Sequence, residues 1–468
     1  MKRSVLICCF LLGTIASSRS IDPDADDGDS DTDTFVDNEY DEESEFATDT
    51  PVTTFPPSNI GTNSLRLVNV LYRHGDRSPT HSYKNDIYQE SDWPQGYGQL
   101  SKKGKKQEYE LGKFLKERYV DSGFLAPIYQ RDEIYVRSTA YDRTLMSANC
   151  VLAALFPPID ETQTWNDDIP WQPIPIHTVP VEEDSLLVMN TSCPAFNEAQ
   201  NEFLQQSPVM NETMAANADL YVYISDNSGE PNTWYGIQNV LDPIYCQSVS
   251  DGYNLPDWVY PQIMNSINEL SDIYAGSLIS PQYAYLRGGP LVSEMMQHMI
   301  NTSINDTLPS KMFMYSAHDT TVVHFLITLG VYNYRKPPYS ACVMVELHEL
   351  QPGDFQVLIL YRNNTEEDPY PLKLPSCDIY CPLKQFIDIM QPSVPTDFKA
   401  ACSLPNPERN RFSAFVSSIE MPEIVAIILG CVLTIVLMVL VIVTVKKKCS
   451  KAVHEYVPVP IEMDECVG

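Results

Sequence analysis

The clearest pattern along the chain is a series of short apolar runs that alternate with amphipathic stretches, and it begins near Leu65. The run LRLVNVLY is rich in branched and apolar residues and predicts a mostly buried strand. After a polar loop, LSKKGKKQEYELGKFLKERY predicts a helix with Ser101 as its N-cap. DEIYVRST predicts a second strand and residues 139–155 a second helix. This order of elements is typical of an α/β protein.

A third unit of the same kind lies late in the chain, after a long interruption. The segment KMFMYSAHDTTVVHFLITLG predicts a strand, a polar turn at Ser316 to Thr320 and a helix. Residues 160–285, roughly, contain many proline, asparagine and aromatic residues, so we expect a smaller inserted cap that is mainly helical. The whole pattern predicts a central, mostly parallel sheet flanked by helices, within a domain of residues 65–403.

Both ends of the chain carry patterns of export and membrane anchoring. Residues 1–20 have a basic start, a short apolar centre and small residues suited to cleavage, as in a secretory signal peptide. After a stalk at 404–423, the uninterrupted apolar stretch 424–445 is long enough to cross a bilayer as a helix. Three lysines follow and are expected to stay in the cytosol. We therefore predict a single-pass type I membrane protein whose domain faces the lumen or the exterior.

The charge is strongly acidic and unevenly distributed. The 468 residues include 62 acidic and 31 basic side chains, which gives a net charge of -31. This balance argues against nucleic acid as a partner, while the apolar content of 44% excludes disorder throughout. Residues 21–64 combine a tract of fourteen acidic residues with a Thr- and Pro-rich linker. We interpret this segment as disordered.

The predicted lumenal region contains an odd number of cysteines and several glycosylation sequons. Seven cysteines lie between the signal peptide and the predicted span, so at least one thiol has no partner within the chain. Cys150 is the best candidate, because its neighbours have the spacing of a buried helix. The sequons lie at Asn190, Asn211, Asn301, Asn305 and Asn363.

Arginine and histidine residues concentrate where the predicted strands end. They are Arg73, His74 and Arg77 after the first strand, Arg137 and Arg143 around the second, and His318 with Asp319 after the third. Ligand sites of α/β sheets form at such strand ends, so we expect these side chains to share a pocket. Because the guanidinium fork fits phosphate oxygens, the pattern predicts a site for a phosphoryl group.

These residue types are suited to phosphoryl transfer through a covalent intermediate. A neutral imidazole can attack phosphorus, and His74 is the candidate because arginines flank it. Asp319 would protonate the leaving alkoxide, while His318 and the arginines hold the phosphoryl oxygens. The scheme requires no metal ion or cofactor. In the alternative interpretation the histidines are structural and Asp319 caps a helix; Arg137 either orients the pocket or pairs with an acid.

Five sequence blocks resemble the histidine acid phosphatase family, most closely its animal prostatic and lysosomal type. LYRHGDRSPT looks like the nucleophile loop, and WPQGYGQLSKKGKKQEYELG, VRSTAYDRTLMSA, QPIPIHTVP and YSAHDTTV resemble later blocks in order and spacing. The resemblance implies a phosphoglycerate mutase-like fold and an acid phosphatase that hydrolyses phosphate monoesters. It implies His74 as phosphoryl acceptor and Asp319 as a donor that is protonated before attack, hence an acidic optimum. It assigns phosphate binding to Arg73, Arg77, Arg143 and His318.

The same resemblance implies disulfides and partners. The implied disulfides are Cys193 with Cys402, Cys246 with Cys342, and Cys377 with Cys381. Related enzymes form dimers, so a homodimer is implied, and the substrates would be small phosphomonoesters or phosphoproteins. Two other functions fit the same fold: a cell-surface binding or adhesion protein without turnover, and a phosphotransferase or mutase. We favour the enzyme, because every matched catalytic residue is present, and the signal peptide opposes a cytosolic mutase.

The tail 446–468 contains a short motif that bears on location. In EYVPV, Tyr456 and Val459 have the spacing of tyrosine-based signals that clathrin adaptors bind. Pro458 suits the extended conformation in which such signals bind. We predict cycling between the plasma membrane and endosomes or lysosomes, with proteolytic release of the enzyme between Leu404 and Met421 as a further option.

Overall fold

The computed structural model describes residues 64–188, 193–206, 208–277, 283–304 and 310–404, together with residues 437–438, 441–442 and 444. The predicted signal peptide, acidic tract, sorting motif and nearly all of the predicted span lie outside these ranges. Among the residues that are described, no helix has the length and apolar character needed to cross a membrane.

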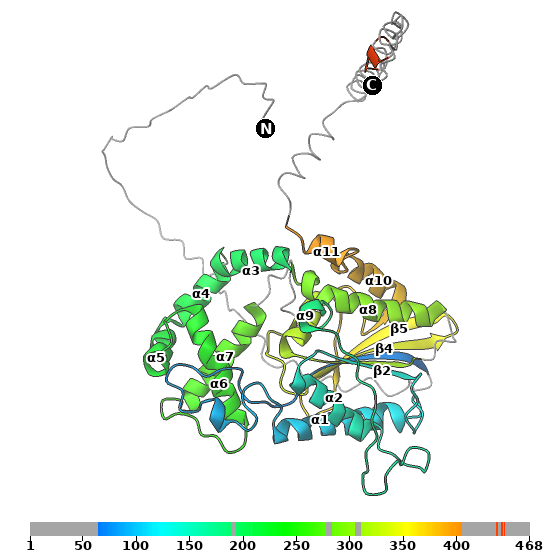
Figure 1. The fold of residues 1–468 in the computed structure, drawn as a ribbon, viewed down its shortest axis with the longest axis horizontal. Coiled ribbons are helices and arrows are strands. Elements are labelled where there is room, and N and C mark those ends of the chain that lie inside the picture. The colour runs from blue at the N-terminus through cyan, green and yellow to red at the C-terminus, as the bar shows by residue number, and fades with distance from the viewer. Residues whose placement is uncertain are drawn as a thin grey trace, which may run out of the picture. The chain divides into compact units, whose positions relative to one another are not determined.

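A mixed sheet forms the centre of the domain (Figure 1). Within the described residues its strands run in the order β2-β3-β1-β4-β5-β6, and β7 pairs with β5. The strands are β1 (Leu65–Arg73), β2 (Ile134–Ser138), β3 (Met312–Ala317), β4 (Cys342–Gln351), β5 (Asp354–Arg362), β6 (Tyr370–Pro371) and β7 (Tyr380–Pro382).

The sheet is less parallel than the sequence predicts. The three strands that the sequence pattern identified, β1, β2 and β3, do pair in parallel. The other pairings, β1 with β4 and β5 with β4, β6 and β7, are antiparallel. The expectation of a mostly parallel sheet is therefore wrong. The antiparallel pairing of β4 and β5 follows from the tight turn between them, where Gly353 adopts φ +81°. A chain that reverses direction in such a turn places the two strands antiparallel.

Helices cover both faces of the sheet (Figure 1). α1 (Lys102–Leu115) and α2 (Asp142–Leu155) pack on one face, and α8 (Tyr285–Ile304), α9 (Asp319–Thr328) and α10 (Leu383–Met390) pack on the other. The short helix α11 (Phe398–Ala401) ends the domain. The first helix begins after Ser101, whose side chain accepts a hydrogen bond from the amide of Gly104, as the sequence predicts.

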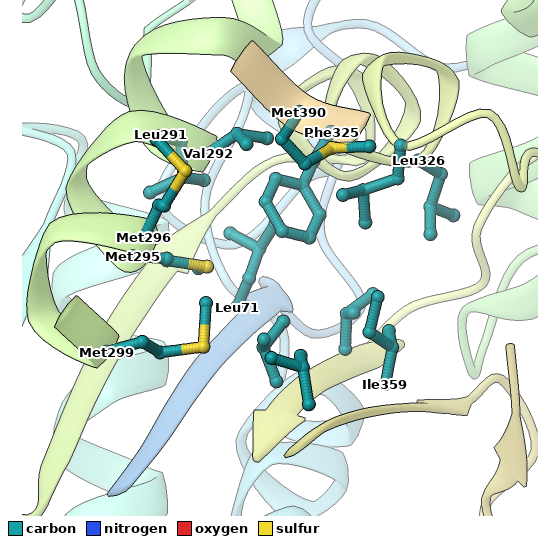
Figure 2. Close-up of a cluster of buried hydrophobic side chains, with 14 of the residues drawn as sticks. Leu71, Leu291, Val292, Met295, Met296, Met299, Phe325, Leu326, Ile359 and Met390 are labelled. Atoms are coloured by element: carbon teal, nitrogen blue, oxygen red, sulfur yellow. The ribbon is translucent and has the colours of Figure 1, made fainter. Parts of the chain in front are cut away.

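Alternate residues of β1 supply the two cores. Val68 and Val70 face α1 and α2, while Leu67 and Leu71 face the opposite side. Figure 2 shows this second core, in which Leu71 lies among methionines of α8 and Phe325 of α9. A strand that is buried on both faces fixes the position of whatever follows it. The loop after β1 therefore starts from a rigid point.

A separate group of helices forms the cap on one side of the sheet domain (Figure 1). It comprises α3 (Pro194–Gln206), α4 (Pro208–Ala216), α5 (Ala218–Ser228), α6 (Trp234–Val249) and α7 (Pro261–Ser277). Ile224, Ile237 and Ile244 lie in a core of its own. The cap starts later than the predicted residue 160, because His177 bridges to Arg137 beside β2 and Leu187 packs in the core of the sheet domain.

The structure contains two of the three implied disulfides, Cys193–Cys402 and Cys377–Cys381. Cys150 is unpaired, as the odd count suggests, but it is half-buried rather than fully buried.

Three of the predicted glycosylation sites lie among the described residues. Asn211 on α4 and Asn301 on α8 are exposed, and Asn363 after β5 is half-buried. Asn190 and Asn305 lie outside the described residues. Glycosylation stays a prediction.

The third implied disulfide, between Cys246 and Cys342, is not formed. Both residues are free and buried. Cys246 of α6 directs its sulfur toward the guanidinium of Arg77, 3.6 Å from Nη1, and the hydroxyl of Tyr339, 3.5 Å away. Cys342 instead packs with the core that β1 forms with α1 and α2. The expectation is therefore wrong for this pair, because the two thiols belong to different environments.

Candidate active site

The carboxyl ends of β1 and β3 bring two histidines together. Arg73 and Ala317 are partners in the parallel register, so His74 and His318 follow at the same edge of the sheet. The amide of His74 donates to the carbonyl of Ala317 at 3.0 Å. The two imidazole centroids lie 5.5 Å apart, with their planes at 73°. The strand ends thus meet as the sequence predicts.

His74 is held in the tautomer that a nucleophile requires. Its Nδ1 lies 2.8 Å from the carbonyl oxygen of Gly75. A carbonyl accepts hydrogen bonds and does not donate, so Nδ1 carries the proton and Nε2 keeps its lone pair. Burial, followed by the charges of Arg143, Arg73 and Arg77, lowers the pKa of His74 well below its usual value. These surroundings therefore favour the neutral imidazole.

Arg73 and Arg77 are anchored by groups outside the RHG loop. Nη1 of Arg73 donates to the carbonyl of Pro337 at 2.6 Å, and its guanidinium carbon lies 4.1 Å from the ring centroid of Tyr339. Arg77 binds both carboxylate oxygens of Asp242 in α6, at 3.1 and 2.9 Å. The buried Nε–H groups of both arginines have no hydrogen-bond partner in the described part of the chain. These donors are available to an anion.

His318 and Arg143 form a pair at the start of α9. Nη2 of Arg143 lies 3.3 Å from Nδ1 of His318, which accepts, so Nε2–H of His318 donates to the hydroxyl of Thr139 at 3.0 Å. Burial and then the charge of Arg143 lower the pKa of His318 to about 3. Burial and then Arg77 lower the pKa of Arg143 to about 10. In mild acid the pair is a neutral imidazole that positions a charged guanidinium.

Asp319 is ionised in the free site. Its Oδ2 pairs with Nη2 of Arg73 at 3.0 Å. Burial by itself raises the pKa of this carboxyl, but Arg73, Lys336 and Arg77 outweigh burial and hold the pKa well below its usual range. The family resemblance implies a carboxyl that is protonated before attack, whereas this carboxyl is ionised before substrate binds. The arginine that positions Asp319 also stabilises its negative charge, so the proton must arrive with the substrate or after the arginines bind the phosphoryl group.

Some residues around the pocket were not found from the sequence. Asp242 lies in the cap and Tyr339 and Lys336 in the loop before β4, where neither periodicity nor a motif distinguishes them. The basic pair in YRKPPY was the one available signal for Lys336. Arg137 is used in a 2.6 Å hydrogen bond to Asp184, which agrees with the expectation that it pairs with an acid. Within the described ranges no cluster of three or more His, Cys, Asp or Glu side chains is arranged to hold a metal ion.

The chain is similar to known proteins over most of its length. A family profile described as histidine phosphatase superfamily (branch 2) matches residues 64–370. The chain is 42% identical over 355 residues to lysosomal acid phosphatase from Homo sapiens, which covers 75% of this chain and 82% of that protein. It is 41% identical over 351 residues to prostatic acid phosphatase from Homo sapiens, with coverages of 73% and 89%.

Solved structures show a similar fold at much lower identity. The phytase of Hafnia alvei in complex with tartrate gives a TM-score of 0.56 at 18% identity, over 73% of this chain and 99% of that one. At this identity the likeness concerns the fold alone.

Proposed function

The chain belongs to branch 2 of the histidine phosphatase superfamily, and we propose that His74 is the residue that carries the phosphoryl group. It is an acid phosphatase that hydrolyses phosphate monoesters through a phosphohistidine. The observation that carries this assignment is the hydrogen bond between Nδ1 of His74 and the carbonyl of Gly75. It leaves Nε2 as the nucleophilic nitrogen. Burial and the neighbouring arginines lower the pKa of His74, which favours the neutral, nucleophilic imidazole.

The first half of the proposed reaction transfers the phosphoryl group to the protein. Arg73, Arg77 and Arg143 bind the phosphoryl oxygens, and His318 supports Arg143. His318 contacts the same group if its Nε2–H turns from Thr139 to a phosphoryl oxygen. Nε2 of His74 attacks phosphorus as the bond between phosphorus and the ester oxygen breaks. As the arginines bind the monoanionic ester, Asp319 takes up the proton of that ester; it then donates this proton to the departing oxygen, and the alcohol leaves.

The second half releases inorganic phosphate. A water molecule gives a proton to the carboxylate of Asp319 and attacks phosphorus, and the bond between phosphorus and Nε2 breaks. The imidazole returns to its starting state, and the proton on Asp319 leaves with the phosphate, which restores the carboxylate. Throughout both halves the arginines keep their charge, which stabilises the transferred group in the transition state.

The test is to trap the intermediate. Rapid denaturation of the wild-type protein during turnover should yield an acid-labile, base-stable phosphoenzyme, and His74→Ala should abolish both the phosphoenzyme and hydrolysis. Lys384→Ala, on the exposed surface of α10, is the matched control and should keep both. Substantial hydrolysis by a folded His74→Ala protein would sink the assignment.

We also propose where the enzyme works. Relatives that include lysosomal acid phosphatases support a lysosomal location, and the apolar stretch 424–445 followed by lysines supports a type I anchor with the catalytic domain lumenal or extracellular. Tyr456 in the tail would bind a clathrin adaptor. Tyr456→Ala should then accumulate at the cell surface in labelling experiments, and an unchanged distribution would contradict the signal.

A homodimer is proposed on family likeness, with analytical ultracentrifugation as its test.

A further inference from the structure

The loop between α9 and β4 fastens a lysine beside the active site. One carboxylate of the cap, Asp272 in α7, holds the loop twice: it accepts from Nη1 of Arg335 at 2.8 Å and from the backbone amide of Lys336 at 2.7 Å. The preceding Tyr334 has φ +57°, a left-handed conformation that a tyrosine adopts only where its surroundings impose it. The position of Lys336 is therefore specified by packing.

The residues that follow Lys336 in this loop contact the phosphate-binding machinery directly. The carbonyl of Pro337 accepts from Arg73, and the ring of Tyr339 lies against the same guanidinium. Nζ of Lys336 lies over the ring of Tyr245, and that ring packs against Tyr339 with 5.6 Å between the two centroids. Tyr339 in turn packs on Arg73, the ion-pair partner of Asp319. Lys336 therefore lies at the edge of the pocket, and its charge lowers the pKa of Asp319.

The ammonium group of Lys336 has no carboxylate as a direct partner. Within the described ranges it forms no ion pair, and its contact is with the face of Tyr245, at 4.8 Å from Nζ to the ring centroid. The side chain is half-buried, so water is partly excluded from it, and burial lowers its pKa. A cation that is partly dehydrated and lacks an ion-pair partner favours the approach of an anion.

We propose that Lys336 determines specificity by binding a second anionic group on the alcohol portion of the substrate. The proposal rests on the function proposed for His74 and Asp319. Asp319 protonates the oxygen of the departing alcohol, so the side chains near Asp319 face that alcohol. A carboxylate or a second phosphate near the ester oxygen would reach Lys336, whereas a neutral alcohol gains nothing from it. The preferred substrates are then phosphate monoesters of acidic or phosphorylated alcohols.

Three aryl phosphates of similar shape and increasing charge test this assignment. They are 4-carbamoylphenyl phosphate, 4-carboxyphenyl phosphate and 1,4-phenylene bisphosphate, and kcat/KM is measured for each with the full chain. In Lys336→Met the ratio of kcat/KM for an anionic ester to that for the neutral ester should fall about tenfold, the size expected from one charge-assisted contact. Lys336→Arg should keep most of the ratio. Lys384→Met, a lysine exposed on α10, should leave the ratio unchanged.

The two anionic esters identify the preferred group, because the larger fall in the ratio marks the anion that Lys336 binds. An unchanged ratio in Lys336→Met overturns the proposal. If kcat/KM itself falls equally on all three esters, Lys336 acts on the charge of Asp319 and not on the second anionic group. Lys336→Gln replaces the methionine variant if that variant does not fold in a thermal melt. Failure of the underlying function looks different, since a folded His74→Ala protein would then still hydrolyse the neutral ester.

Discussion

Around His74, each titratable side chain is held in one protonation state by its neighbours. Burial with nearby arginines keeps His74 and His318 neutral, the latter with a pKa of about 3, and Arg73 keeps Asp319 ionised. His318 and Asp319 therefore keep their charge states as the pH rises from about 4 to about 7. The titration of these two side chains in the free enzyme does not account for an acidic optimum. The second ionisation of a phosphate monoester, with a pKa of about 6, does fall in this range.

The first prediction follows from that electrostatic state. Because kcat/KM reports ionisations of the free enzyme and free substrate, its decline at higher pH should follow the second pKa of the substrate. Esters of more acidic alcohols, whose second pKa is lower, should show the decline at correspondingly lower pH. The measurement is kcat/KM against pH for a series of phenyl phosphates. A decline at the same pH for every ester would show instead that an enzyme group controls it.

The second prediction concerns the proton donor. Asp319→Asn keeps the size of the side chain but cannot donate a proton to a departing oxygen, so kcat for alkyl phosphates should fall by about 10²–10⁴-fold. Aryl phosphates should lose much less, because a phenolate leaves without protonation. The comparison is kcat on the two classes of ester, with Asp142→Asn in α2 as a control for the loss of one carboxylate. Equal losses on both classes would assign Asp319 to positioning Arg73.

At the scale of elements, the approach of α1 to the loop after β1 depends on two glycines. Gly75 and Gly104 face each other so closely that a Cβ on either would overlap backbone atoms of the other segment. Ser101, the N-cap of α1, donates from its amide to the carbonyl of Asp76 at 2.9 Å, and its hydroxyl bonds the carboxylate of the same residue. The helix end therefore supports the nucleophile loop directly.

The third prediction tests that support. Gly104→Ala should force α1 away from the loop, lower stability by about 1–3 kcal/mol and reduce kcat/KM by at least about tenfold, since misplacement of a nucleophile is costly. Urea unfolding and kinetics measure the two effects. Lys106→Ala, an exposed position on the same helix, is the control and should change neither. If Gly104→Ala lost stability but kept full activity, the loop would not depend on the helix for its position.

The same elements show which parts of the fold and of the site the sequence could predict. The strand, loop and helix units at β1, β2 and β3 were predictable, because periodicity and caps are local properties. The pairing direction of β4 was not, because a strand that is buried on both faces appears as an apolar run whichever way it pairs. His74, Arg73 and His318 follow strand ends and were found. Lys336 and Asp242 reach the pocket from a loop and from the cap, and tertiary packing alone brings them there.

At the scale of the whole molecule, the pocket lies where the cap meets the sheet domain, and the ion pair between Arg77 and Asp242 joins the two beside the pocket. Arg77 follows β1, and both its terminal nitrogens bind Asp242 of α6; the backbone amide of Thr80 also donates to that carboxylate, at 3.2 Å. Burial alone raises the pKa of Asp242, but Arg77 outweighs it and holds the pKa well below its ordinary value of 3.8. A carboxyl of this kind contributes stability that is present above that ordinary value and is lost as the pH falls below it. The connection between cap and sheet domain therefore persists at the acidity of a lysosome.

The last prediction is that this pair both holds the cap and sets the phosphate affinity. Asp242→Asn leaves the guanidinium of Arg77 buried without a counter-charge, so the free energy of unfolding should fall by about 3 kcal/mol. That deficit should stay constant from about pH 7 to about pH 5 and shrink only in stronger acid, where the wild-type carboxyl also takes up a proton. Inhibition by inorganic phosphate should weaken in the variant, because Arg77 is no longer held in place. Asp226→Asn, on the exposed face of α5, controls for the loss of one cap carboxylate. A variant with wild-type stability and unaltered inhibition would mean that apolar packing alone seats the cap, and that Arg77 binds phosphate without help from it.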